Sequence, residues 1–251
     1  FVGVAKSSSQ RFIFVASSGN NMSEWYFMEG EDPASELTLV EPRRPDFEYD
    51  IDHHGERFLI RNNGDGARDF KVSETPISAP GFTNWQDFVP HVLGRPIAGF
   101  GLSQDYFVLY YRTNGLPQVQ IRNLASGETH ELTLDEEDYA VRLQGNREWD
   151  SSNLRFSYAS LTTPATVYDY DMVTREREFR KQTEVLGDFS SDKYQSRRVF
   201  ATAADGNQIP ISVLYAKDTP LDGSAPLYLY GYGSYGLIIE SDFCSARLSL
   251  V

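Results

Sequence analysis

The chain has 251 residues, enough for one large domain or two ordinary ones with a sizeable core. Its formal net charge of −13 at pH 7 argues against nucleic-acid binding, which needs clustered Lys and Arg to neutralise phosphates. No apolar run approaches the ~20 residues that span a bilayer, and the single cysteine, Cys244, excludes an intrachain disulfide.

The two ends of the sequence do not resemble natural termini. The chain begins at Phe1 without a methionine and stops at Val251 within an apolar stretch. We therefore expect an internal fragment of a longer protein. A lone thiol fits a reducing compartment, so we expect a cytoplasmic protein. The periplasm is the alternative, because the native N-terminus is expected to be missing.

The first 182 residues contain an internal repeat. Four segments each place a polar turn before an aromatic-rich strand, and their equivalent phenylalanines are spaced by 46, 49 and 49 residues: Phe12, Phe58, Phe107 and Phe156. Further apolar–polar alternations surround each phenylalanine, which gives about four strands per unit. Four strands in about 45–50 residues are typical of a propeller blade.

We therefore predict a mainly β fold in which residues 1–182 form about four blades of a larger β-propeller. Four blades could also close a ring alone. A β-sandwich is the weaker interpretation, because it predicts no regular period.

After the repeat the pattern changes. Two strands, 197–202 and 209–215, surround the hairpin turn signal Asp205-Gly206. Residues 227–230 are apolar throughout, which is typical of a buried central strand. Ser241 and Asp242 could cap a short helix over residues 243–251. The sequence thus predicts that residues 183–251 open a second, α/β domain.

The apolar run ends in the glycine-rich stretch 231–236, GYGSYG. Its spacing fits G-x-G-x-x-G, the fingerprint of a dinucleotide-binding turn. That interpretation also needs a helix at the third glycine and an acidic residue about 20 positions later. The stretch after Gly236 looks extended, and Glu240 follows only four residues later, so the dinucleotide site is disfavoured.

The same stretch, with Asp242-Phe243 and residues 245–250 after it, resembles the prolyl oligopeptidase family of serine peptidases, and its oligopeptidase B branch in particular. Residues 43–49, 181–185 and the hairpin entry 204–213 are also similar to that branch, so the likeness covers essentially the whole chain. The resemblance implies a seven-bladed propeller that caps an α/β-hydrolase domain. A Ser-Asp-His triad would lie between them.

The resemblance also implies roles for four residues. Tyr232 matches a tyrosine whose hydroxyl binds the developing oxyanion, and Tyr235 matches a position in the specificity pocket. Glu240 and Asp242 match carboxylates of the substrate subsites, although the first position is more commonly Asp in the branch. Cleavage of short peptides after Arg or Lys is implied, with the propeller gating access.

The sequence lacks the nucleophile signature G-x-S-x-G, so we expect the triad to lie outside this chain and the chain alone to be inactive. We expect no cofactor, no membrane partner and no metal. The stretch Asp50–His54 is dense in possible ligands, but strand alternation sends neighbouring side chains to opposite faces. Two alternatives remain open: a non-catalytic propeller module, and a proline-specific peptidase of the same family.

Overall fold

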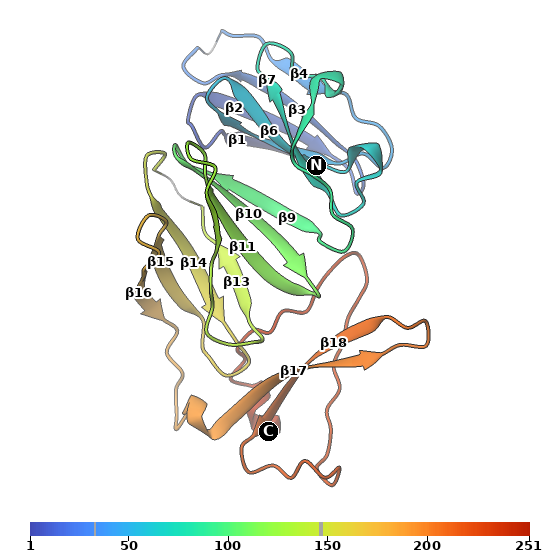
Figure 1. The fold of residues 1–251 in the computed structure, drawn as a ribbon, viewed down its shortest axis with the longest axis vertical. Helices are drawn as coiled ribbons and strands as arrows, with labels where there is room; N and C mark the ends of the chain where they lie inside the picture. Colours follow the sequence, from blue (N-terminus) through green and yellow to red (C-terminus); the bar gives the residue numbers. More distant parts are fainter. Residues whose placement is uncertain (33, 146–147) are drawn as a thin grey trace. The chain divides into compact units, whose positions relative to one another are not determined.

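The computed structural model describes residues 1–32, 34–145 and 148–251 and shows four four-stranded antiparallel sheets followed by a two-stranded hairpin (Figure 1). The chain forms two compact units. The first consists of Phe1–Asn114, Gln118–Leu132 and Gly145–Asn153, and the second of Gly115–Pro117, Thr133–Gln144 and Leu154–Val251. No helix in the described part of the chain is long and apolar enough to cross a membrane.

Each sheet is a meander in which successive strands are neighbours, as the repeat predicts. The first sheet contains β1 (Val2–Lys6), β2 (Phe12–Ser18), β3 (Ser23–Glu29) and β4 (Thr38–Glu41). The second contains β5 (Tyr49–His54), β6 (Arg57–Asn62), β7 (Lys71–Pro76) and β8 (Gln86–Val89). The third contains β9 (Ile97–Leu102), β10 (Tyr106–Thr113), β11 (Leu116–Asn123) and β12 (Thr129–Glu131).

The fourth sheet contains β13 (Ala140–Leu143), β14 (Asn153–Ala159), β15 (Thr166–Asp171) and β16 (Arg177–Gln182). The hairpin consists of β17 (Tyr194–Thr202) and β18 (Gln208–Ala216). The remaining elements are short 3-10 turns: η1 (Gly64–Gly66), η2 (Phe82–Asn84), η3 (Ser191–Lys193) and η4 (Arg247–Leu250). The four-blade prediction is confirmed, and the sandwich alternative is excluded because each four-stranded unit forms its own sheet.

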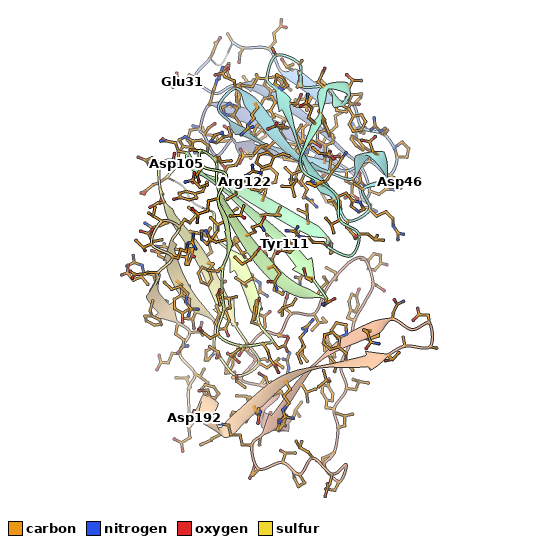
Figure 2. All side chains as sticks on the ribbon, in the orientation of Figure 1. Glu31, Asp46, Asp105, Tyr111, Arg122 and Asp192 are labelled. Atoms are coloured by element: carbon orange, nitrogen blue, oxygen red, sulfur yellow. The ribbon has the colours of Figure 1, made fainter. Side chains whose placement is uncertain are left out.

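The four equivalent phenylalanines all lie on the second strand of their sheet and are at most 2% exposed. The Phe58 ring contacts those of Phe12, Phe14 and Phe27, with centroids 5.5, 5.9 and 4.9 Å apart, so the first two sheets share an aromatic core. Leu59 and Phe107 belong to a second core shared by the second and third sheets. Tyr111, labelled in Figure 2, lies on β10 and belongs to this second core.

Polar turns join the first two sheets. The Ser8 amide donates to Asp52 at 2.8 Å, and the Ser8 hydroxyl also donates to this carboxylate. The His53 Nε2 lies 2.7 Å from the Gly55 carbonyl and must donate to it, so Nδ1 accepts from the Ser9 hydroxyl at 2.6 Å. Burial lowers the pKa of His53, which favours this neutral form. These side chains therefore serve as hydrogen-bonding partners in the turns. Among the described residues, no three His, Cys, Asp or Glu side chains are grouped so that they could hold a metal ion.

Two local predictions differ from the structure. Residues 227–230 form no strand and are 60–83% exposed, because no described strand pairs with their backbone. The helix predicted over residues 243–251 is shorter than expected, because only Arg247–Leu250 are helical, as the 3-10 helix η4, and the Ser241 side chain does not cap it but bonds to Asp138.

Candidate functional site

The predicted oxyanion donor lies in an irregular segment, residues 225–241, that follows the hairpin. Tyr232 is 49% exposed, so its ring is not buried among aliphatic side chains. Tyr235 is 94% exposed. Both tyrosines are accessible to a ligand.

The sharp bend of this segment lies after Tyr232 and not beside it. The Leu237 amide donates to the Ser234 carbonyl at 3.1 Å, and the two residues between them have positive φ, 58° at Tyr235 and 67° at Gly236. Gly236 suits this conformation because it has no Cβ. Gly231 and Gly233 instead leave open space, since a Cβ added at either would meet no atom within 4 Å. Gly231 and Gly233 therefore leave the backbone on each side of Tyr232 open, without bending the chain there.

The Asp242 carboxylate binds a guanidinium from the same unit. Arg142 on β13 donates through both terminal nitrogens, Nη1 to Oδ1 at 2.7 Å and Nη2 to Oδ2. This is the bidentate, charge-assisted arrangement that makes carboxylates selective for arginine. The two side chains are 51% and 40% exposed. Asp242 thus has the geometry for recognising a guanidinium, but its own chain supplies that guanidinium here.

A buried ion pair holds the residue before Asp242. Asp138 is fully buried and its Oδ1 accepts from Arg198 Nη1 and from the Ser241 hydroxyl, both at 2.9 Å. The Ser241 hydroxyl is also 3.0 Å from that of Ser212 on β18. Asp138 therefore links the segment before β13 to Arg198 on β17 and, through Ser241, to Ser212 on β18. Ser241 lies between the half-buried residues Glu240 and Asp242, so this cluster fixes the backbone that carries both.

Close packing around Arg198 adds to this cluster. Gly115 has a φ of 78°, and a Cβ there would lie 3.3 Å from Arg198 Nη2 and from a Pro210 carbon. The Arg198 amide also donates to the Glu137 carboxylate at 3.1 Å. Sequence reasoning missed Asp138, Arg198 and Arg142, because partners 60 to 103 positions apart leave no local pattern.

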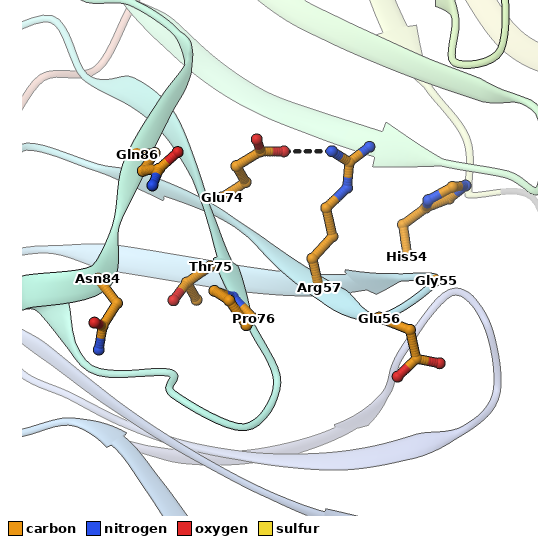
Figure 3. Close-up of a pocket in the computed structure, with 9 residues that line it drawn as sticks. All are labelled: His54, Gly55, Glu56, Arg57, Glu74, Thr75, Pro76, Asn84 and Gln86. Carbon is orange, nitrogen blue, oxygen red and sulfur yellow. Dashed lines mark hydrogen bonds and ion pairs between the residues drawn. The ribbon is translucent and has the colours of Figure 1, made fainter.

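Two hollows lie away from the predicted residues. One, of about 320 Å³, lies in the second sheet, where Arg57 pairs with Glu74 (Figure 3). The other, of about 620 Å³, is lined by Glu136, Glu137, Thr162 and residues 194–197. Glu136 accepts from Tyr158, Thr162 and Thr163, so its oxygens already have partners. Neither hollow contains Tyr232, Tyr235, Glu240 or Asp242.

Comparison with known proteins identifies the family. Residues 1–183 match the family described as prolyl oligopeptidase, N-terminal beta-propeller domain. The chain belongs to the prolyl oligopeptidase family. Members of this family are serine peptidases, so the mainly β propeller prediction and the recognised resemblance are both confirmed.

Individual relatives agree with this assignment. The chain is 35% identical to dipeptidyl aminopeptidase BI of Pseudoxanthomonas mexicana, over 100% of this chain and 34% of that protein. It is 30% identical to protease 2 of Moraxella lacunata, over 99% of this chain and 35% of that protein. The structure of oligopeptidase B from Trypanosoma brucei with covalently bound antipain superposes with a TM-score of 0.92 at 33% identity, and covers 100% of this chain and 37% of that one. The chain spans about a third of the length of these relatives.

Proposed function

We propose that this chain is part of a cytoplasmic serine oligopeptidase that hydrolyses short peptides after Arg or Lys. The observation that carries the proposal is the Asp242 carboxylate, which holds a guanidinium through two hydrogen bonds while remaining 40% exposed. A peptide arginine presents the same planar fork. Family membership supplies the serine-peptidase chemistry to which this recognition would be coupled.

We assign residues 1–182 to the propeller and 183–251 to the opening of the α/β-hydrolase domain. The last strand of the fourth sheet ends at Gln182, and the hairpin that follows pairs with none of the four sheets. The triad would come from the part of the protein outside this chain, because G-x-S-x-G is absent here. The propeller would act as a size filter that admits only short peptides.

In the intact enzyme Tyr232 would donate its phenolic hydrogen to the oxyanion that forms when serine attacks the scissile carbonyl. A donor aimed at developing charge stabilises the transition state by roughly 2.7–4 kcal/mol. The exposure of Tyr232, 49%, and the open space beside the backbone at Gly231 and Gly233 support this role. Tyr235 would contact the side chain before the cleaved bond, and Glu240 and Asp242 would bind cationic substrate groups.

Assays on the full-length protein test the specificity. Fluorogenic peptides are compared that differ only in having Arg, Lys or Pro before the cleaved bond. The Arg and Lys peptides should be hydrolysed much faster than the Pro peptide. Exclusive cleavage after Pro would contradict the proposal, and so would the absence of peptidase activity, which would favour the non-catalytic propeller module. The 35% identity to a dipeptidyl aminopeptidase makes the release of dipeptides from the substrate's N-terminus a second candidate activity. Faster hydrolysis of peptides with a free N-terminus than of the same peptides with an acetylated N-terminus would indicate this activity.

The Tyr232→Phe variant tests the oxyanion role. We expect kcat to fall about 10²–10³-fold with KM largely unchanged, because the lost donor acts only on the transition state. Tyr228→Phe is the matched control, since Tyr228 is 68% exposed in the same segment. An unchanged kcat in Tyr232→Phe would remove Tyr232 from the mechanism.

A further inference from the structure

Three carboxylates of the second unit that pair with arginine differ in how accessible they are. Asp138 is fully buried with Arg198, whose side chain is 13% exposed. Asp169 is shared by Arg155 and Arg180 and its side chain is 11% exposed. Arg142 and Asp242, by contrast, are 51% and 40% exposed. Water and solutes can therefore reach the third pair, whereas the first two are part of the folded framework.

The backbone on each side of the exposed pair is fixed independently of the pair itself. Ser241 is held by Asp138 and Ser212, and the Asp242 carbonyl accepts from Arg247 at 3.3 Å. Arg142 lies on β13, where it is paired in register with Ser157 of β14. Because neither anchor depends on the ion pair, the two side chains can separate while the local fold stays intact.

The pair also places a guanidinium where a basic substrate group is expected. Both oxygens of Asp242 are engaged by the Arg142 fork, so a second guanidinium cannot form the same bidentate contact at the same time. A peptide arginine or lysine must therefore displace Arg142 before it can pair with Asp242. A neutral peptide side chain needs no such displacement.

We propose that Arg142 is a specificity-determining residue that competes with the basic side chain of the substrate for Asp242. This inference rests on the proposed function, because it takes Asp242 as a substrate-binding group. Arg142 weakens the binding of peptides that carry a basic residue at the Asp242 subsite and leaves other peptides unaffected. The result is a moderated preference for a basic residue at that subsite instead of a maximal one.

The size of the effect follows from the population of the internal pair. Exposed ion pairs are weak, typically below about 1 kcal/mol. Such a pair would be closed about half to four-fifths of the time. The apparent affinity of Asp242 for the substrate's basic group equals its intrinsic affinity multiplied by the fraction of molecules in which the pair is open. Removing Arg142 should therefore lower KM for the basic peptide about 2- to 5-fold.

The test uses the full-length enzyme and peptide pairs that carry Arg or Gln at one position near the cleaved bond. Asp242→Asn first identifies the subsite, as the position at which this variant loses the preference for Arg over Gln. At that position Arg142→Gln should lower KM for the Arg peptide about 2- to 5-fold, with KM for the Gln peptide and both kcat values unchanged. The double variant Arg142→Gln/Asp242→Asn should behave like Asp242→Asn alone.

Arg177→Gln is the matched control, because Arg177 forms an ion pair with Asp135 at 2.7 Å in the same unit without contacting Asp242. It should leave both KM values unchanged. Arg142→Lys keeps the charge but loses the fork, so it should give an intermediate KM for the Arg peptide. This variant also decides the matter if Arg142→Gln fails to fold.

The outcomes separate the two claims. If Asp242→Asn keeps the full Arg preference at every position, the proposed substrate role of Asp242 is wrong. If Asp242→Asn loses the preference but Arg142→Gln leaves KM for the Arg peptide unchanged or raises it, Arg142 is no competitor. The inference is then overturned while the proposed function stands.

Discussion

At the scale of single residues, the partners of a carboxylate decide whether it holds the fold or can meet a ligand. Asp169 on β15 accepts from Arg155 at 2.6 and 2.8 Å and from Arg180 at 2.7 Å. Two guanidinium groups favour its charged form, and the hydrogen bond from Arg155 is the largest influence that lowers the pKa of Asp169, to about 2. Asp242 has one guanidinium partner and its side chain is 40% exposed. The first carboxylate is therefore structural, and the second is available for exchange.

Asp169 should make the stability of the second unit depend on pH in a defined window. Its pKa is lower in the folded state than the ordinary value of 3.8, so its stabilisation is present above pH 4 and is lost as the pH falls toward 2. Asp169→Asn should lower the free energy of unfolding by about 1–2 kcal/mol at pH 6, and this difference should shrink between pH 4 and pH 2.

Urea unfolding at several pH values measures this difference. Asp135→Asn is the control, because the Asp135 side chain is 64% exposed and its single ion pair with Arg177 should contribute less than about 1 kcal/mol. A difference for Asp169→Asn that stays constant from pH 6 to pH 2 would show that its charge does not stabilise the fold.

At the scale of elements, the aromatic residue that repeats on the second strand of each sheet sets how neighbouring sheets pack. Phe58 is fully buried on β6 and meets three phenylalanine rings of the first sheet. Phe58→Ala should therefore destabilise the first unit by about 3–5 kcal/mol, because a large buried ring leaves a cavity between two sheets. Chemical denaturation followed by tryptophan fluorescence measures this loss.

Phe179→Ala on β16 is the companion variant, since Phe179 is 58% exposed. It should cost no more than about 1 kcal/mol, which is the range of substitutions away from a core. Equal losses for the two variants would show that the repeated phenylalanine is not the packing centre of its sheets.

The same elements show which parts of the structure were predictable. The four sheets follow from a repeat of turn and aromatic strand, because local alternation and burial act together there. β8 carries a weak local signal, because its sequence, QDFV, is short and half polar. Residues 227–230 were predicted as a central strand on apolar content alone, but a strand also needs hydrogen-bonding neighbours, and none of the described strands supplies them. Tyr232 and Asp242 could be picked out by resemblance, whereas Arg142 could not, since its contact arises only in three dimensions.

At the scale of the whole molecule, the segment after the hairpin exposes several large apolar side chains. Leu227 and Leu229 are 83% and 78% exposed, and Leu237, Ile238 and Ile239 are 46–59% exposed. Large exposed apolar patches mark surfaces that another part of a protein covers. The net charge of −13 opposes contact between copies of the chain at low ionic strength, and salt screens this repulsion.

Residues 1–251 expressed alone should therefore bind an apolar dye and self-associate, and the self-association should increase with salt. Leu227→Ser/Leu229→Ser should reduce both effects, because it removes two of the most exposed side chains of the segment. Val173→Ser is the control, since Val173 is 65% exposed but lies outside this segment. Dye fluorescence and sedimentation velocity at two salt concentrations provide the measurements.

In the full-length protein the segment should be covered and dye binding low. Equal dye binding by the two forms would mean that the rest of the protein does not pack on these residues, and their assignment to the opening of a hydrolase domain would then be untenable.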